Sequence, residues 1–173
     1  VTEQAATSDH AAYGLYVPEN YSVTRAWPVI VCLHGAYGHG YEYLWTWSLL
    51  QPDVDIDSIR AMLSDLAERY HIDAERIYLS GLSDGGSFAY VLGLSCPSLF
   101  AGVAPIAGVL HPITDRLLRA KQGLEVPLFV VHGARDFIFD VRAVRSHCGL
   151  LEKLGYRLTY IELPEWGHAY TDG

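Results

Sequence analysis

Short apolar segments alternate with amphipathic segments along this chain, and no other sequence feature constrains the fold as strongly. Pro28–Leu33 is a continuous apolar run that ends in His34-Gly35, a pattern typical of a strand buried on both faces. Strands that alternate with helices form mostly parallel sheets, because the helices supply the crossover connections. The sequence therefore predicts an α/β fold: one domain over residues 1–173, with a mostly parallel central sheet flanked by helices. Strands are expected at Tyr13–Val17, Pro28–Leu33, Arg76–Leu79, Gly102–Ile106, Val126–Val131 and Arg157–Leu163, and helices at 55–70, 87–94 and 141–154.

Composition and charge restrict the class of partner. Of the 173 residues, 18% are charged and 12% are aromatic, which excludes intrinsic disorder. Twelve basic and twenty acidic residues give a net charge of −8, so the chain lacks a basic surface that could neutralise nucleic-acid phosphates. No apolar run approaches the roughly 18 residues of a membrane span. We expect neither a nucleic-acid partner nor a membrane span, and the sequence leaves the oligomeric state open.

The cysteines and the first residue bear on the compartment in opposite directions. Cys32, Cys96 and Cys148 are an odd number without a C-x-x-C pair, which predicts buried free thiols and favours the cytoplasm. The chain begins at Val1 and its single methionine is Met62, so the first residue is not a translation start. Removal of a signal peptide, and hence secretion, stays open.

A candidate nucleophile follows the expected strand at Arg76–Leu79. Gly81-Leu82-Ser83-Asp84-Gly85 has the G-x-S-x-G pattern, which is weak alone but here stands between a strand and a helix. Such a turn exposes the serine hydroxyl, and the Asp84 N–H at the helix start is placed to stabilise an oxyanion. The alternative is an ordinary glycine-rich turn between a strand and a helix.

A serine nucleophile needs a base, and the base needs an acid that orients it. His168 follows the last expected strand and is the best candidate base, because His34 and His132 are each followed by glycine and are expected to shape their own loops. Asp136 follows the strand that ends near Val131 and is favoured as the acid. Asp140 is the alternative acid, but its position at the start of the next helix fits an N-cap better.

The order Ser83, Asp136, His168, with each residue at a strand end, resembles the α/β-hydrolase superfamily. More narrowly, the chain is similar to the small phospholipase/carboxylesterase and dienelactone-hydrolase-like serine esterases. The resemblance rests on His34-Gly35, the Ser83 turn, the segment from His132 to Asp136 and Gly167-His168. It implies a catalytic triad of Ser83, Asp136 and His168, no large lid, and an oxyanion hole formed by the N–H groups of Ala36 and Asp84.

Several details of the site follow from the same resemblance. Tyr37 is the fallback oxyanion donor, and Tyr37 and Tyr41 are candidates for the substrate pocket, although aromatic clusters of this kind also occur simply as core. The acidic residue after the nucleophile is unusual, so we expect the Asp84 side chain to point away from the oxyanion. The chain has neither metal-ligand spacing nor a glycine-rich phosphate loop, so we expect no metal and no cofactor.

The expected function is a serine hydrolase that cleaves small carboxylic esters with short to medium acyl chains through an acyl-enzyme. Thioesterase, lysophospholipase or peptidase activity on the same triad is the nearest alternative, because substrate choice depends on pocket shape. A binding protein that keeps the fold without catalysis is an alternative from another class.

One stretch of the chain is too short for the fold that the resemblance implies. Between the strand ending at His34-Gly35 and the helix near Asp55, the family has a helix and a further strand. Tyr41–Asp53 has thirteen residues for both, whereas a helix averages about eleven residues and a strand about five. We therefore expect that the printed sequence lacks a strand, in a segment of roughly 15 to 25 residues between about Trp45 and Pro52.

Overall fold

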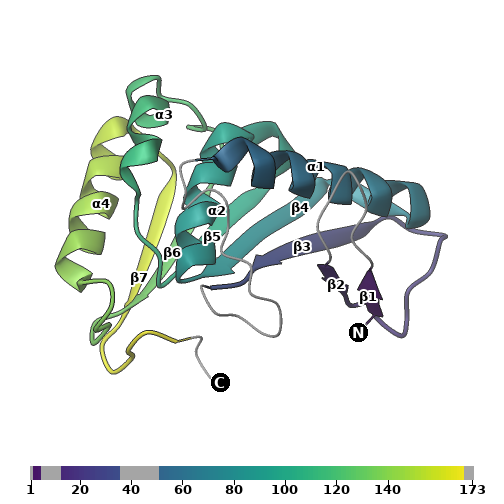
Figure 1. Cartoon of the computed structure of the whole chain (residues 1–173), viewed down its shortest axis with the longest axis horizontal. Coiled ribbons are helices and arrows are strands. Elements are labelled where there is room, and N and C mark those ends of the chain that lie inside the picture. Colours follow the sequence, from purple (N-terminus) through teal and green to yellow (C-terminus); the bar gives the residue numbers. More distant parts are fainter. Residues whose placement is uncertain (1, 5–12, 36–50, 170–173) are drawn as a thin grey trace.

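A five-stranded parallel sheet forms the centre of the structure (Figure 1), a computed structural model that describes residues 2–4, 13–35 and 51–169. The strand order is β3-β4-β5-β6-β7, so each crossover moves the chain to the next strand in the same direction. A separate antiparallel pair joins β1 (Thr2–Gln4) and β2 (Tyr13–Leu15). The five strands are β3 (Trp27–Leu33), β4 (Ile72–Leu82), β5 (Gly102–Ile106), β6 (Leu128–Gly133) and β7 (Leu158–Leu163).

The crossover helices are α1 (Pro52–Arg69), α2 (Asp84–Ser95), α3 (Asp115–Arg119) and α4 (Val141–Leu154). The helix expected from residue 55 begins earlier, at Pro52, because proline at the first helical position has a suitable fixed φ and lacks the N–H that would stay unpaired there. Asp140 caps α4, since its carboxylate accepts a hydrogen bond of 2.8 Å from the Arg142 N–H. Among the described residues, no helix is both long and apolar enough to cross a lipid bilayer.

The core forms on one face of the sheet, where strand register aligns apolar side chains. Val31, Leu79, Val103, Leu128 and Leu158 are neighbours across the five strands, and all but the partly buried Leu158 are at most 7% exposed. Helix α2 packs on this row and buries nearly every side chain from Ser87 to Leu94. The sheet and α2 therefore hold rigidly the turn that connects β4 to α2.

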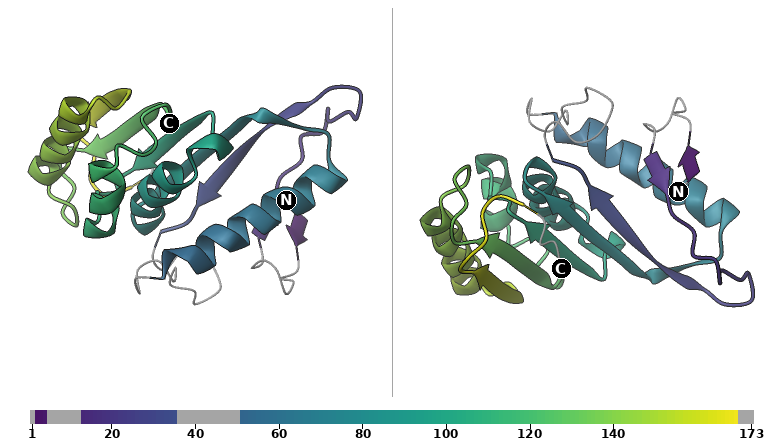
Figure 2. Two further views of the ribbon diagram at one scale, coloured as in Figure 1. Left: turned by 90° about the horizontal axis from the view of Figure 1, so that it is seen from above. Right: turned by 90° about the horizontal axis from the view of Figure 1, so that it is seen from below.

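The expectation that β3 is buried on both faces is wrong. Burial alternates along the strand: Val31 and Leu33 are buried, whereas Ile30 is 67% exposed and Cys32 is exposed as well. Cys32 is thus not the buried thiol that was expected, although Cys148 is buried and Cys96 is half-buried. The reason is that α1 and α2 lie on the same side of the sheet (Figure 2). Tyr78, Phe129 and Ile161 are also exposed, on the face that carries Ile30.

The segment between β3 and α1 bears on the strand expected to be missing. Residues 36–50 lie outside the described part of the chain, so the absence of a segment between Trp45 and Pro52 stays a prediction. Within the described residues, β3 pairs with β4 and has no strand along its other edge. An additional strand would have unpaired backbone groups of β3 to bond with.

Candidate active site

Three loops at one edge of the sheet bring together Ser83, Asp136 and His168. Ser83 follows β4, Asp136 follows β6 and His168 follows β7, and the carboxyl ends of parallel strands lie at a common edge. His168 Nδ1 lies 2.7 Å from Asp136 Oδ2, and His168 Nε2 lies 2.7 Å from Ser83 Oγ. Because a carboxylate only accepts, Nδ1 carries the proton, and the neutral ring then accepts from the Ser83 hydroxyl through Nε2.

The Ser83 turn has a backbone conformation that few residues other than glycine adopt. Ser83 has φ 58° and ψ −117°, and it immediately precedes the first residue of α2. The flanking glycines are needed for close approach: a Cβ at Gly81 would lie 2.3 Å from the Gly85 carbonyl oxygen, and one at Gly85 would lie 2.4 Å from that of His34. The G-x-S-x-G pattern is therefore explained by close packing within the turn at Gly81 and against the end of β3 at Gly85.

The two oxygens of Asp136 have separate partners. Oδ2 contacts His168, while Oδ1 accepts hydrogen bonds of 2.8 Å from the backbone N–H groups of both Ile138 and Phe139. His132 is 1% exposed, and its Nε2 donates to the Phe139 carbonyl at 2.9 Å. The Asp136 carboxylate thus bonds to the backbone of the turn that follows it, and His132 bonds to the same turn at Phe139. His132 therefore shapes its loop, as expected from the sequence.

Backbone contacts join the His168 loop to the Asp136 loop. The Arg135 N–H donates to the Trp166 carbonyl at 2.8 Å, and a Cβ at Gly133 would lie 2.3 Å from the same oxygen. Arg135 also forms an ion pair with Glu165, and both side chains are exposed. The relative position of Asp136 and His168 is therefore set mainly by main-chain packing, which is stiffer than an exposed ion pair.

Of the two expected donors of the oxyanion hole, only Asp84 lies within the described residues. As the first residue of α2, Asp84 has an N–H without a partner inside the helix, whereas Ala36, Tyr37 and Tyr41 lie outside the described residues. The Asp84 oxygen Oδ2 is buried and has no hydrogen-bond partner within the described ranges. Burial raises the pKa of this carboxyl above its usual value, and nearby Asp55 adds to the effect.

Sequence reasoning missed two aromatic side chains beside His168. The rings of Phe137 and Phe139 lie with their centroids 6.4 and 5.5 Å from that of His168, both edge to face. The only local signal was the position of these apolar residues directly after a candidate acid, and it does not show which ring they contact.

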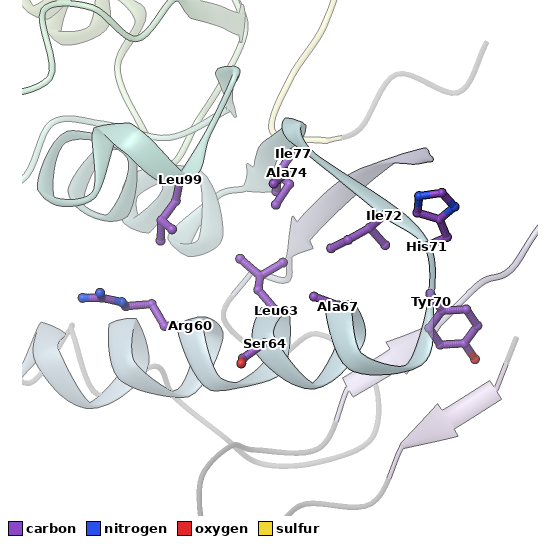
Figure 3. A pocket seen from close by; sticks show the side chains of 10 residues that line it. All are labelled: Arg60, Leu63, Ser64, Ala67, Tyr70, His71, Ile72, Ala74, Ile77 and Leu99. Atoms are coloured by element: carbon purple, nitrogen blue, oxygen red, sulfur yellow. The ribbon is translucent and has the colours of Figure 1, made fainter. Parts of the chain in front are cut away.

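A hollow lies away from these residues. A cavity of about 430 Å³ opens between α1 and the amino-terminal half of β4, lined by residues that include Leu63, Ile72 and His71 (Figure 3). Its one histidine bonds to the backbone, with Nδ1 2.8 Å from the Val23 carbonyl. Within the described ranges, no group of three or more His, Cys, Asp or Glu side chains is placed to hold a metal. The edge that carries Ser83 is therefore the candidate active site.

Comparison with known proteins shows the family of this chain. Residues 54–172 match the sequence profile of the phospholipase/carboxylesterase family. The chain belongs to this family. The match spans all three residues of the hydrogen-bonded series and most of helix α1, which precedes them.

Curated relatives of this phospholipase/carboxylesterase chain include esterases and thioesterases. It is 28% identical over 138 residues to a bifunctional acetylxylan esterase/xylanase of Neocallimastix patriciarum, covering 78% of this chain and 20% of the relative. It is 29% identical over 98 residues to acyl-protein thioesterase 1 of Gibberella zeae, covering 55% and 42%. The chain thus spans between a fifth and about two fifths of the length of these relatives.

Solved structures share the α/β-hydrolase fold with this phospholipase/carboxylesterase chain. Esterase PE8 superposes with a TM-score of 0.71 at 18% identity, over 88% of this chain and 90% of that one. A ferulic acid esterase of Anaeromyces mucronatus superposes with a TM-score of 0.69 at 16% identity, over 89% and 77%. At these identities the similarity establishes the fold.

Proposed function

We propose that this chain is a serine hydrolase that cleaves carboxylic esters of short to medium acyl chains, with Ser83, His168 and Asp136 as its catalytic triad. The observation that carries the proposal is the unbroken hydrogen-bonded series from the Ser83 hydroxyl through His168 to Asp136, with both contacts at 2.7 Å. A serine hydroxyl next to a neutral imidazole, which is itself held by a carboxylate, is the arrangement that activates a serine nucleophile.

In the acylation step, Ser83 Oγ attacks the ester carbonyl carbon while His168 Nε2 takes the hydroxyl proton. The Asp136 carboxylate, bonded to Nδ1–H, stabilises the imidazolium that forms. The Asp84 N–H, with that of Ala36, binds the negative charge that develops on the carbonyl oxygen. When the tetrahedral intermediate collapses, the carbon–oxygen bond to the alcohol breaks, and His168 gives its proton to the departing oxygen.

In the deacylation step, water attacks the acyl–Ser83 ester and loses its proton to His168. The second tetrahedral intermediate collapses to the free acid and restores the Ser83 hydroxyl with the proton from His168. Protons and electrons balance over the cycle with only ester and water consumed. The proposed reaction therefore requires no cofactor.

A thioester is the second candidate substrate, because acyl-protein thioesterase 1 is among the curated relatives. The same acyl-enzyme serves both substrates, since a thiolate departs at least as readily as an alkoxide. Rates on an alkyl ester, the matching thioester and a peptide amide of the same acyl group separate esterase, thioesterase and peptidase activities. The highest kcat/KM on the amide would contradict the proposal.

A fluorophosphonate probe tests the proposal directly, because it reacts only with an activated serine. The protein should incorporate one equivalent, Ser83→Ala should incorporate none, and ester turnover of this variant should fall by about 10⁴-fold or more. Ser22→Ala is the matched control: this hydroxyl is exposed, bonds to Thr24 and should be dispensable for labelling. Failure of the unaltered protein to label would support a non-catalytic binding protein, and Ser83→Ala activity within about tenfold of the unaltered protein would exclude Ser83 as nucleophile.

A further inference from the structure

Two apolar side chains at the tip of the Asp136 turn are largely exposed to solvent. Phe137 is 85% exposed and Ile138 is 53% exposed. Single exposed apolar residues are common on protein surfaces, but a large adjacent pair next to a candidate active site is a feature of binding surfaces. Their location, one and two residues after the candidate triad acid, calls for a functional explanation.

Hydrogen bonds to Asp136 and His132 hold the main chain of the tip. Asp136 Oδ1 accepts from the Ile138 and Phe139 N–H groups, and buried His132 donates to the Phe139 carbonyl. Because these bonds fix the backbone around Phe137, the main chain has little conformational entropy left to lose when a ligand covers the side chain. The main chain that carries the Phe137 ring is therefore preorganised.

The chemistry of His168 determines which part of an ester reaches this tip. The departing oxygen must come within about 2.6–3.2 Å of His168 Nε2 to receive its proton. The Phe137 ring lies 6.4 Å, centroid to centroid, from the imidazole that donates this proton. Because the departing oxygen is held next to this imidazole, the alcohol is the part of the ester closest to the side chains that flank the ring.

Apart from Asp136, which His168 and two backbone N–H groups hold, the charges nearest the tip in sequence are paired with one another. Arg135 pairs with Glu165, and Asp140 pairs with Arg142, which holds the pKa of Asp140 at about 2. These pairs leave the tip with little net charge to attract a charged alcohol. An apolar ring remains as the main recognition element.

We propose that Phe137, with Ile138, is the contact surface for the alcohol part of the substrate and makes the enzyme prefer esters of aromatic or other bulky apolar alcohols. The inference rests on the proposed function, because the alcohol part lies beside His168 only if this histidine donates a proton to the departing oxygen. It assigns specificity to the leaving group and leaves acyl-chain preference to other residues.

Two series of esters test the proposal: the first varies only the alcohol part, and the second varies only the acyl part. In the first, butanoate is joined to ethanol or to 2-phenylethanol, alcohols of similar acidity that differ in a ring. In the second, ethanol is joined to acetate, butanoate or hexanoate. Phe137→Ala should lower the ratio of kcat/KM for the phenylethyl ester over the ethyl ester by about 2- to 13-fold, the range for loss of one aromatic contact.

The matched variants separate the ring from general effects. Phe137→Leu should give an intermediate ratio, because it keeps apolar area and loses the flat ring. Val23→Ala removes another exposed apolar side chain, which is 71% exposed. Val23 lies just before the start of β3, whereas the candidate active site lies at the carboxyl ends of the strands, so this variant should leave the ratio unchanged. In the acyl series all three variants should keep the preference of the unaltered protein, and the rate of deacylation should not depend on the alcohol.

The failures of the two proposals are distinguishable. If Ser83 is labelled and esters are cleaved, but Phe137→Ala leaves the phenylethyl-to-ethyl ratio within about twofold, the leaving-group assignment is overturned and the esterase stands. If Phe137→Ala loses turnover only on emulsified esters and keeps the ratio on soluble ones, the tip docks on a lipid or polymer surface instead. If the unaltered protein neither labels nor cleaves esters, both proposals are wrong.

Discussion

Asparagine at position 136 would separate the structural task of Asp136 from its catalytic one. The Ile138 and Phe139 N–H groups both point at Oδ1 at 2.8 Å, so an amide must keep its oxygen there. The reversed orientation would place an NH₂ against two donors at a cost of about 2–6 kcal/mol, since each unpaired buried donor costs about 1–3 kcal/mol. The amide nitrogen is thereby forced to face His168 Nδ1.

An NH₂ group at 2.7 Å from Nδ1 reverses the histidine tautomer. Nδ1 must then accept, so the ring proton moves to Nε2 and points at Ser83, which removes the base. A forced tautomer of this kind lowers kcat by about 10⁴-fold, which corresponds to about 5.4 kcal/mol of transition-state stabilisation. Because the turn bonds survive, the free energy of unfolding should change by only about 1–2 kcal/mol.

The assay is turnover of a p-nitrophenyl ester together with urea unfolding of the same preparation. Asp140→Asn is the control, because Asp140 is exposed, caps α4 and pairs with Arg142, and it should keep activity within about threefold of the unaltered protein. Loss of activity in Asp140→Asn with retention in Asp136→Asn would refute the assignment of the acid. Retention in both would refute the triad.

Two further predictions concern packing and pH. Gly85→Ala should destabilise the fold by about 1–3 kcal/mol and lower activity, because its Cβ would meet the Leu33 and His34 carbonyl oxygens at 2.4 Å; in Gly149→Ala the new Cβ meets nothing within 4 Å, and unfolding should show a gain of about 0.5–1 kcal/mol. A neutral result for Gly85→Ala would disprove the close approach of α2 to β3. The Arg145 guanidinium, assisted by Tyr160, holds the pKa of Glu162 at about 2, below the ordinary value of about 4.3. Because its pKa is lowered in the folded protein, Glu162 stabilises the fold at every pH above its ordinary pKa, and this stabilisation is lost as the pH falls toward 2. The difference in free energy of unfolding between the unaltered protein and Glu162→Gln should therefore be constant near neutral pH and shrink between about pH 5 and 2. A difference that grows on acidification would contradict the pairing.

The candidate triad was predictable because each of its members carries a local signal. Ser83 lies between glycines that the turn requires, and Asp136 and His168 each follow an apolar run. Parallel strands then bring these ends to one edge although Ser83 and His168 are 85 positions apart. The choice of Asp136 over Asp140 was also local, since only Asp140 stands where a helix needs a cap.

Other features could not be read locally. The full apolar run of β3 predicted burial on both faces, yet burial depends on what packs against a strand, and Ile30 stays exposed because α1 and α2 lie on one side of the sheet. Likewise, nothing in the residue types of Phe137 and Phe139 indicates which of them lies in solvent and that both face an imidazole from another loop.

The sequence by itself determined the alternation of strands and helices, the strained serine turn and the residue types that can act as nucleophile, base and acid. These depend on backbone preferences and on periodicity, which are properties of a few consecutive residues. The tertiary structure alone decided the division of labour between the two oxygens of Asp136, the support from buried His132 and the apolar tip beside His168. Each of these depends on distances between segments that meet only when the sheet is assembled, and such distances have no counterpart in local sequence pattern.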